Sequence, residues 1–590
     1  MKNILIIMVL IAGLASCNKT GFLDNKSTTL DETAVFSDSI RTMQFLNRIY
    51  ADIGFSFTKG RWSSHGNSEF ATDDAEYQLS GATQAAVVLY NGTISPTNLP
   101  SGLTDFWNLP YTNIRRANLM LSKLPVVPLP EDGNSAVASK KRVKAETRFL
   151  RAWYYSQLMI AFGGVPNVGD NVYGIDDVIL LPRQNFAELV AYITKELDEA
   201  GADLPNTSYD FLDTRDFGRA TKGACMALKS RVLLYAASPL FNGGATTTDP
   251  NIAKLVSHPS YSVSHWQAAA DAAQALINSG YFSLWNPASP IAGFGFYQTF
   301  LNSRTSAPTA SQNKELIFGM FRPAGKDFES YYNPPSRSGA RYSFPTQNLV
   351  DAFPMKNGKA ITDPTSGYNP ATPYLNRDPR FRYTIIFNGS FYMQNNNTQG
   401  VVNTFVGAAS DGYNTTITGY YSRKMCDSTL AQGGSGSIDR PWPLIRYAEV
   451  LLNYAEAINE TGQTTLAYDK LKELRMRAGI DIGDGLYGMK AGMTQAEMRA
   501  FIQNERRIET SFEDLRWHDI RRWKIAMVVS NGFNRSVKIT GTAPNWVYTY
   551  VNTSDVQASR LHVFRPEMHL LPIADDEIRK NPAMIQNPGW

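Results

Sequence analysis

The chain has 590 residues, of which 43% are hydrophobic and 19% are charged. It is therefore long enough to bury a large core without disulfides or metal ions, and its composition excludes a disordered protein. The net charge of +4 comes from 57 basic and 53 acidic residues spread along the chain, which argues against nucleic acid as a partner. The three cysteines, Cys17, Cys225 and Cys426, give no disulfide framework. Cys225 lies in a helical pattern and is predicted to be a buried small hydrophobe, whereas Cys426 stays unassigned.

The first segment is predicted to be an export signal. Lys2 precedes an apolar run from Ile4 to Ser16, which as a helix would extend only about 20 Å, against roughly 30 Å for a bilayer core. The run ends in Leu-Ala-Ser-Cys at residues 14–17, which resembles the lipobox of bacterial lipoproteins. We therefore predict a signal peptide over 1–16, lipidation of Cys17 and a polar tether over 17–30. The alternative is a secreted protein that is cut after Ala15 or Ser16, with no role for Cys17.

Helical periodicity dominates the first half and the late part of the chain. Amphipathic helices are predicted over 105–124, 143–162 and 186–200. Helix pairs with small alanine positions are predicted from 220–237 with 264–279 and from 447–459 with 465–478. The predicted fold class is therefore mainly α, a tetratricopeptide-like scaffold of helix pairs with a loop-rich face and a few short strands.

The middle of the chain differs in composition and lacks helical periodicity. Residues 281–441 are rich in Gly, Pro, Asn, Ser and Thr, and short strands are predicted only over 315–320 and 382–387. Long loops in a compact protein usually carry function, so we expect the ligand face here and in the loop-like stretch 55–104. The domain organisation predicted from this is an N-terminal helical region over 31–280, a loop-rich insertion over 281–441 and a C-terminal helical region over 442–590.

No catalytic motif stands out. The sequence has no GxSxG, no phosphate loop, no HExxH and no CxxC, and its six histidines lack metal-ligand spacing. The stretch 481–485 resembles the start of a calcium loop, but Gly492 occupies the position of the acidic ligand. We therefore predict no catalytic residue, no metal and no cofactor.

The densest charge cluster runs over 504–523. Glu505, Glu509 and Glu513 would share one helical face and could form a catalytic carboxylate pair, as in a glycoside hydrolase. Arginines at helical offsets favour a structural ion-pair network instead; they are Arg506, Arg516 and Arg522.

Aromatic residues are the remaining candidates for ligand contact, because Tyr and Trp combine a flat apolar face with a polar group. Those on helical stripes are predicted to be core: Trp107, Trp153, Tyr154 and Tyr235. Those in loop-rich parts, with nearby polar side chains, are the predicted ligand contacts: Trp62, Asp73, Asp74, Tyr77, Trp285, Phe296, Tyr297, Tyr331, Tyr332, Arg341 and Tyr342.

A series of short motifs follows the lipobox along the chain: FLD at 22–24, IRRAN at 114–118, ETRFLRA at 146–152, FGGVP at 162–166, RDPRF at 377–381, RYAE at 446–449, NYAEA at 453–457, LRMRAG at 474–479, DIRRW at 519–523, LPIA at 571–574 and QNPGW at 586–590. In this order they resemble the motifs of the SusD/RagB family of outer-membrane nutrient-binding lipoproteins from Bacteroidetes. No single motif is specific, but together they span the chain.

The resemblance implies a lipid-anchored protein at the outer membrane, exposed on the cell surface. It would capture an oligosaccharide, or in some members a peptide, and deliver it to a SusC-like TonB-dependent transporter without chemistry. Three departures from the family pattern are Asp514 in place of a common Gly, Ala574 in place of a second Pro, and the lack of an acidic run after Cys17. A purely structural scaffold remains a further alternative.

Overall fold

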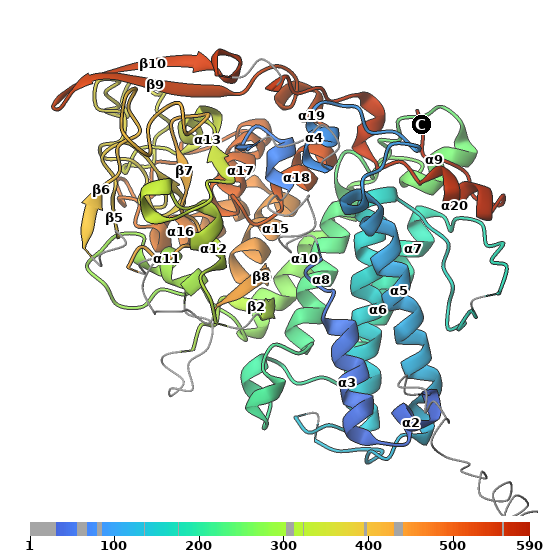
Figure 1. Ribbon diagram of the computed structural model, residues 1–590. Coiled ribbons are helices and arrows are strands. Elements are labelled where there is room, and N and C mark those ends of the chain that lie inside the picture. The colour runs from blue at the N-terminus through green and yellow to red at the C-terminus, as the bar shows by residue number, and fades with distance from the viewer. Residues whose placement is uncertain are drawn as a thin grey trace, which may run out of the picture.

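The computed structural model describes residues 31–55, 68–78, 85–134, 136–174, 176–301, 312–321, 324–393, 398–429, 440–556 and 560–590. The long N-terminal helices lie on the right of Figure 1, and the loops and short strands lie on the left, around the C-terminal helices α15 (Tyr447–Glu460), α16 (Ala467–Ala478) and α17 (Gln495–Glu509). Within the described ranges, no helix is both long and apolar enough to cross a bilayer.

The long helices pack on one another nearly in chain order. They are α5 (Ser101–Lys123), α6 (Lys140–Phe162), α7 (Phe186–Gly201), α8 (Lys222–Ala237), α10 (Val263–Ser279), α15 (Tyr447–Glu460), α16 (Ala467–Ala478) and α17 (Gln495–Glu509). α5 packs on α6, α6 on α7, α7 on α8 and α8 on α10; α10 then packs on α15, which carries α16 and α17. The predicted helices and both predicted helix pairs are confirmed, and so is the mainly α, tetratricopeptide-like fold class.

Local sequence sets where these helices begin and end. The side chains of Ser139, Thr221 and Ser262 cap α6, α8 and α10 by accepting hydrogen bonds from the first turn of each helix. α10 and α16 end at Gly280 and Gly479, which adopt the left-handed conformation that glycine tolerates best.

The remaining α-helices of the described chain have at most 12 residues. They are α2 (Glu32–Phe36), α3 (Ser39–Tyr50), α4 (Ala85–Tyr90), α9 (Pro250–Val256), α11 (Phe294–Leu301), α12 (Asp327–Tyr332), α13 (Gln347–Ala352), α14 (Phe381–Thr384), α18 (Arg516–Arg522), α19 (Ala526–Val529) and α20 (Asp575–Lys580).

All strands of the described chain form two-stranded antiparallel sheets. The pairs are β1 (Ala75–Tyr77) with β3 (Ser343–Pro345), β2 (Leu316–Phe321) with β8 (Pro441–Arg446), β4 (Ile385–Ile386) with β7 (Tyr421–Ser422), β5 (Phe391–Met393) with β6 (Gln399–Val401), and β9 (Arg535–Thr542) with β10 (Asn545–Asn552). The strand predicted over 315–320 is confirmed as β2. The strand predicted over 382–387 is wrong for most of its length, because α14 takes Phe381–Thr384 and leaves only two residues to β4.

Buried ion pairs join α17 and the residues just after it to other segments of the middle and C-terminal parts of the chain. Glu509 accepts from Arg446 (2.7 Å), Arg380 (2.8 Å) and Arg477, and Glu513 accepts from Arg446 and Lys424 (both 2.6 Å). Glu505 pairs with Arg475 at 3.2 Å. The structural interpretation of these carboxylates is confirmed.

The predicted partners of this network were wrong, because the helix expected over 504–523 is interrupted. α17 ends at Glu509, and Phe512 and Asp514 have positive φ angles of 58° and 62° before α18 begins. The arginines named from helical spacing therefore point elsewhere: Arg506 pairs with Asp519, Arg516 with Asp73 and Arg522 with Glu456.

Candidate ligand-binding site

Three tyrosines from distant parts of the sequence form one aromatic surface, which we call the tyrosine patch (Tyr77, Tyr331 and Tyr342). β1 and β3 pair with Tyr77 opposite Ser343, and the Tyr342 N–H donates to the Tyr331 carbonyl at 2.8 Å. The Tyr342 ring lies 6.3 Å from that of Tyr77, in a stacked arrangement, and 6.0 Å from that of Tyr331. Strand pairing and one backbone hydrogen bond thus hold the three rings together.

The patch has a buried floor and an accessible rim. Tyr77 is 3% exposed and packs on Phe70 at a ring distance of 5.1 Å, whereas Tyr331 and Tyr342 are half-buried. Rings whose positions are fixed by packing can stack on a flat ligand without a further loss of side-chain freedom.

Arg341 adds a cationic hydrogen-bond donor at the rim. Its φ angle of 55° is a left-handed conformation that a non-glycine residue adopts at a cost of order 1 kcal/mol. Its Nη1 donates to the Thr415 carbonyl at 3.3 Å, and it forms no ion pair with any described residue. The half-buried guanidinium therefore keeps donors for a ligand.

Asp73 and Asp74 lie beneath this surface in buried ion pairs. Asp73 contacts Arg507 and Arg516 at 2.9 Å, and Asp74 contacts Arg507 at 2.6 Å. Burial opposes ionisation of Asp73, but the two arginines outweigh it and lower the pKa of Asp73. For Asp74, burial outweighs the same arginines and raises the pKa. These carboxylates position β1, and their role as ligand contacts stays a prediction that would require the ion pairs to open.

The other predicted contacts do not join the patch. Phe296 is fully buried between Lys424 and Arg477, and Tyr297 is 8% exposed with its hydroxyl on Ser428. Trp285 is half-buried and donates its backbone N–H to Glu315 at 2.8 Å. Tyr332, also half-buried, packs on Phe328 of α12. Trp62 and Cys17 lie outside the described residues.

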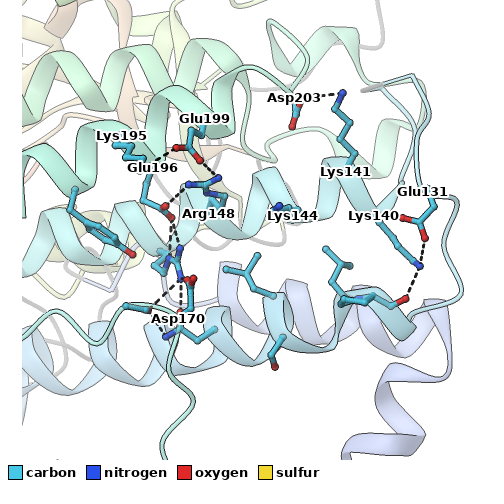
Figure 2. Close-up of a pocket in the computed structure, with 18 of the residues that line it drawn as sticks. Glu131, Lys140, Lys141, Lys144, Arg148, Asp170, Lys195, Glu196, Glu199 and Asp203 are labelled. Atoms are coloured by element: carbon cyan, nitrogen blue, oxygen red, sulfur yellow. Dashed lines mark hydrogen bonds and ion pairs between the residues drawn. The ribbon is translucent and has the colours of Figure 1, made fainter.

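A charged cleft of about 940 Å³ lies among α5, α6 and α7 (Figure 2). Its cations are paired within the cleft: Lys140 with Glu131 (2.5 Å), Lys141 with Asp203 (3.3 Å), Arg148 with Glu196 (2.6 Å) and Arg151 with Asp170 (2.5 Å). Figure 2 shows these pairs as dashed lines, with Lys144 the labelled cation that has none. Because the charges cancel locally, this cleft offers little net field for a ligand.

A second, more apolar cleft of about 740 Å³ lies between α5, residues between Pro166 and Ile179, and α20. The sequence analysis missed it, because Trp107 was assigned wholly to the core. Trp107 is indeed only 8% exposed, but it lines this cleft together with Tyr111, one turn further along α5, and with Tyr173. The available signal was the row of Trp107, Tyr111 and Arg115 at spacings of four residues, which places an exposed arginine beside two aromatic rings on one helix face.

Helix pairs with a loop-rich face that carries an aromatic patch define the class of protein, a tetratricopeptide-like helical scaffold. Residues 302–590 match the SusD family model, and residues 21–234 match a family model described as starch-binding and associating with the outer membrane. The chain belongs to the SusD/RagB family, which confirms the resemblance seen in its motifs.

Known proteins agree with this family assignment. SusD-like protein P38 of Formosa agariphila is 24% identical over 457 residues, which is 76% of this chain and 77% of that protein. A SusD-like protein of Bacteroides fragilis has a similar solved structure, with a TM-score of 0.73, 24% identity and coverage of 95% of this chain and 99% of that one. A SusD-like carbohydrate-binding protein of Bacteroides fragilis gives a TM-score of 0.71, 23% identity and coverage of 94% and 100%.

Proposed function

We propose that this protein captures oligosaccharides at the tyrosine patch and passes them to a SusC-like TonB-dependent transporter in the outer membrane. The observation that carries the proposal is the fixed arrangement of Tyr77, Tyr331 and Tyr342, with Arg341 beside them, in a chain of this family. The patch supplies apolar planes for the C–H faces of sugar rings, and Arg341 supplies donors for hydroxyl oxygens.

Capture without chemistry is the second part of the proposal. The best candidates for a catalytic pair, Glu505, Glu509 and Glu513, have at most 4% of their side chains exposed and are held by arginines. A general acid must reach the glycosidic oxygen and a nucleophile the anomeric carbon, which carboxylates locked in this network do not do. Their burial therefore supports a binding protein over the glycoside hydrolase alternative.

The membrane anchor belongs to the proposal as well. The lipobox-like 14–17 segment favours lipidation of Cys17, and the family model matched by residues 21–234 is described as associating with the outer membrane. Several acyl chains on one cysteine would give stable anchoring, because a single chain binds a membrane only marginally.

One observation favours peptide capture as a second candidate. β10 is an uncharged strand, NWVYTYVN, that pairs with β9 on one edge only among the described strands. It lies at the outer rim of the molecule in Figure 1, so an extended peptide could add to its other edge. Sugar binding would depend on the tyrosine patch, whereas this peptide mode would depend on β10.

The test is a glycan panel presented to the mature protein by affinity electrophoresis and calorimetry. We expect binding to at least one glycan, weakened about tenfold or more by Tyr331→Ala and by Tyr342→Ala, because each change removes a stacking plane. Tyr261→Ala is the matched control, since Tyr261 is 62% exposed and lies outside the patch. Binding to peptides with no binding to any glycan would overturn the proposal.

A further inference from the structure

The cleft beside α5, lined by Trp107, Tyr111 and Tyr173, is separate from the tyrosine patch. We call it the α5 cleft. Its walls are α5, the segment that follows α6, and α20 with the residues just after it. In Figure 1, α5 and α20 lie on the opposite side of the molecule from α12, which carries Tyr331. A ligand bound here would therefore not touch the patch residues.

The aromatic floor of the α5 cleft is fixed before any ligand arrives. The rings of Trp107 and Tyr111 lie 5.0 Å apart, and Trp107 packs edge-on against Phe162 at 5.2 Å. The Tyr111 hydroxyl donates to the Pro166 carbonyl at 2.7 Å. Because these contacts hold the rings in place, little side-chain entropy would be lost on binding.

The opposite wall is tied to α5 through Arg115. Its Nε donates to the Tyr173 carbonyl at 2.7 Å, and Tyr173 lines the same cleft as Trp107 and Tyr111. Asp177 accepts from the Gly174 N–H at 2.6 Å, and Asp176 and Asp177 line the rim of the cleft.

Three charges at this rim are not neutralised within the described protein, although Glu577 and Lys580, which also line the cleft, pair with each other at 2.7 Å. Among the residues the structure describes, Arg115, Asp176 and Asp177 form no ion pair, although all three are exposed lining residues. The charged cleft of Figure 2 is the contrast, because there almost every cation has its own carboxylate. The α5 cleft thus combines aromatic planes with free planar donors and acceptors.

Aromatic rings together with unpaired charged groups at the rim favour one class of ligand. A purely apolar ligand would leave the charged rim desolvated and unpaired, which is costly. A pyranose ring has two apolar faces that can stack on the aromatic side chains. The hydroxyls at its edge can donate hydrogen bonds to carboxylates and accept them from amides and a guanidinium. The volume of about 740 Å³ lies in the range of small-molecule sites and leaves room for a short oligosaccharide.

We propose that the α5 cleft is a second carbohydrate-binding site, formed by Trp107, Tyr111 and Tyr173 with Arg115, Asp176 and Asp177. The proposal takes the class of ligand from the proposed function but places it at a new surface. Two sites on one tethered protein would hold a long glycan more tightly than either site alone, because the second contact becomes intramolecular.

The experiment uses calorimetry with heptasaccharides from the panel, maltoheptaose and laminariheptaose among them, on the intact mature protein. We expect two heptasaccharides per wild-type molecule. The double variant Tyr331→Ala/Tyr342→Ala should lose binding at the tyrosine patch and still bind one heptasaccharide at the α5 cleft. The double variant Arg115→Gln/Tyr173→Ala should weaken binding at the α5 cleft at least tenfold and still bind one heptasaccharide at the tyrosine patch. Arg215→Gln is the control, because its side chain is 88% exposed and pairs only with neighbouring Asp213. Thermal melting checks that each variant is folded.

The outcomes separate this proposal from the proposed function. One bound heptasaccharide that Tyr331→Ala/Tyr342→Ala abolishes and Arg115→Gln/Tyr173→Ala leaves intact would overturn the second site alone. No glycan binding by the wild type would overturn both. A peptide that protects the α5 cleft from hydrogen exchange, with no such protection by any heptasaccharide, would overturn the carbohydrate assignment of the cleft.

Discussion

At the scale of single residues, buried charges affect the stability of the fold more than exposed charges do. Glu509 is fully buried, and burial alone would raise its pKa. The positive charges of Arg477, Arg446 and Arg380 more than offset this and lower the pKa of Glu509 well below its ordinary value of 4.5. Removing one member of such a network leaves its partners buried and uncompensated, which is far more costly than losing a surface pair.

Glu509→Gln is therefore expected to destabilise the protein by about 3 to 5 kcal/mol at pH 7. For a cooperative transition of this size, that corresponds to a melting temperature lower by roughly 3 °C. Folding lowers the pKa of Glu509, so the ionised carboxylate makes its full contribution to the free energy of unfolding above about pH 4.5. That contribution is lost progressively as the pH falls below this value and the carboxylate becomes protonated. The difference between wild type and variant, measured by calorimetry, should hence shrink from pH 5 to pH 3.

The control for this prediction is Glu32→Gln, which breaks an exposed pair with Lys123. Its effect should stay within about 1 kcal/mol, as for other surface ion pairs. Equal effects of the two substitutions would contradict the idea that the Glu509 network anchors the fold.

At the scale of elements, two glycines at helix ends differ in what they provide, a backbone conformation alone or also close packing against another segment. Gly280 and Gly479 end α10 and α16 with φ angles of 67° and 81°. A Cβ on Gly280 would meet nothing within 4 Å, whereas one on Gly479 would lie 2.8 Å from the Ala292 Cβ and 2.9 Å from the Gly293 nitrogen. Gly280 thus serves backbone conformation alone, and Gly479 also allows α16 to pack against the segment before α11.

Gly280→Ala is expected to cost about 1 kcal/mol, because only the left-handed conformation is penalised. Gly479→Ala should cost an additional 1 to 3 kcal/mol, roughly, for the forced backbone shift. Thermal unfolding of the two variants side by side measures the difference. Equal losses would show that the segment at Ala292 moves aside freely.

At the scale of the whole molecule, the proposed lipid at Cys17 and the two proposed binding surfaces lie on one chain but require different parts of it. The proposed anchor needs the predicted signal peptide and Cys17, residues 1–17, together with an export machinery, whereas the tyrosine patch needs the packed fold. Ion pairs between distant segments, such as Asp73 with Arg516 and Glu76 with Arg560, hold the patch region to the C-terminal part of the chain.

Cys17→Ala is accordingly expected to leave folding and glycan affinity unchanged but to move the protein out of the membrane fraction. Fractionation followed by immunoblotting, with thermal melting of the purified variant, checks both halves of this expectation. A variant that stays in the membrane fraction would contradict lipidation at Cys17.

The sequence alone was sufficient for the helical scaffold and for the family. Apolar periodicity and capping residues are local, so 143–162 and 186–200 were predicted close to α6 and α7. The structural role of Glu505, Glu509 and Glu513 was also predictable, since arginines are dense around them. The identity of their partners was not, because Arg380, Arg446 and Arg477 come from other elements.

Only the tertiary structure decided which aromatic residues can meet a ligand. Composition treats Tyr77, Phe296 and Tyr342 alike, but packing buries Phe296, makes Tyr77 a floor and leaves Tyr342 at the rim. Likewise, the helical spacing of Trp107 predicts a core residue, although it also lines the α5 cleft, whose other walls are formed by residues between Pro166 and Ile179 and by α20. The physical reason is that exposure depends on contacts between segments hundreds of residues apart, which periodicity and composition do not record.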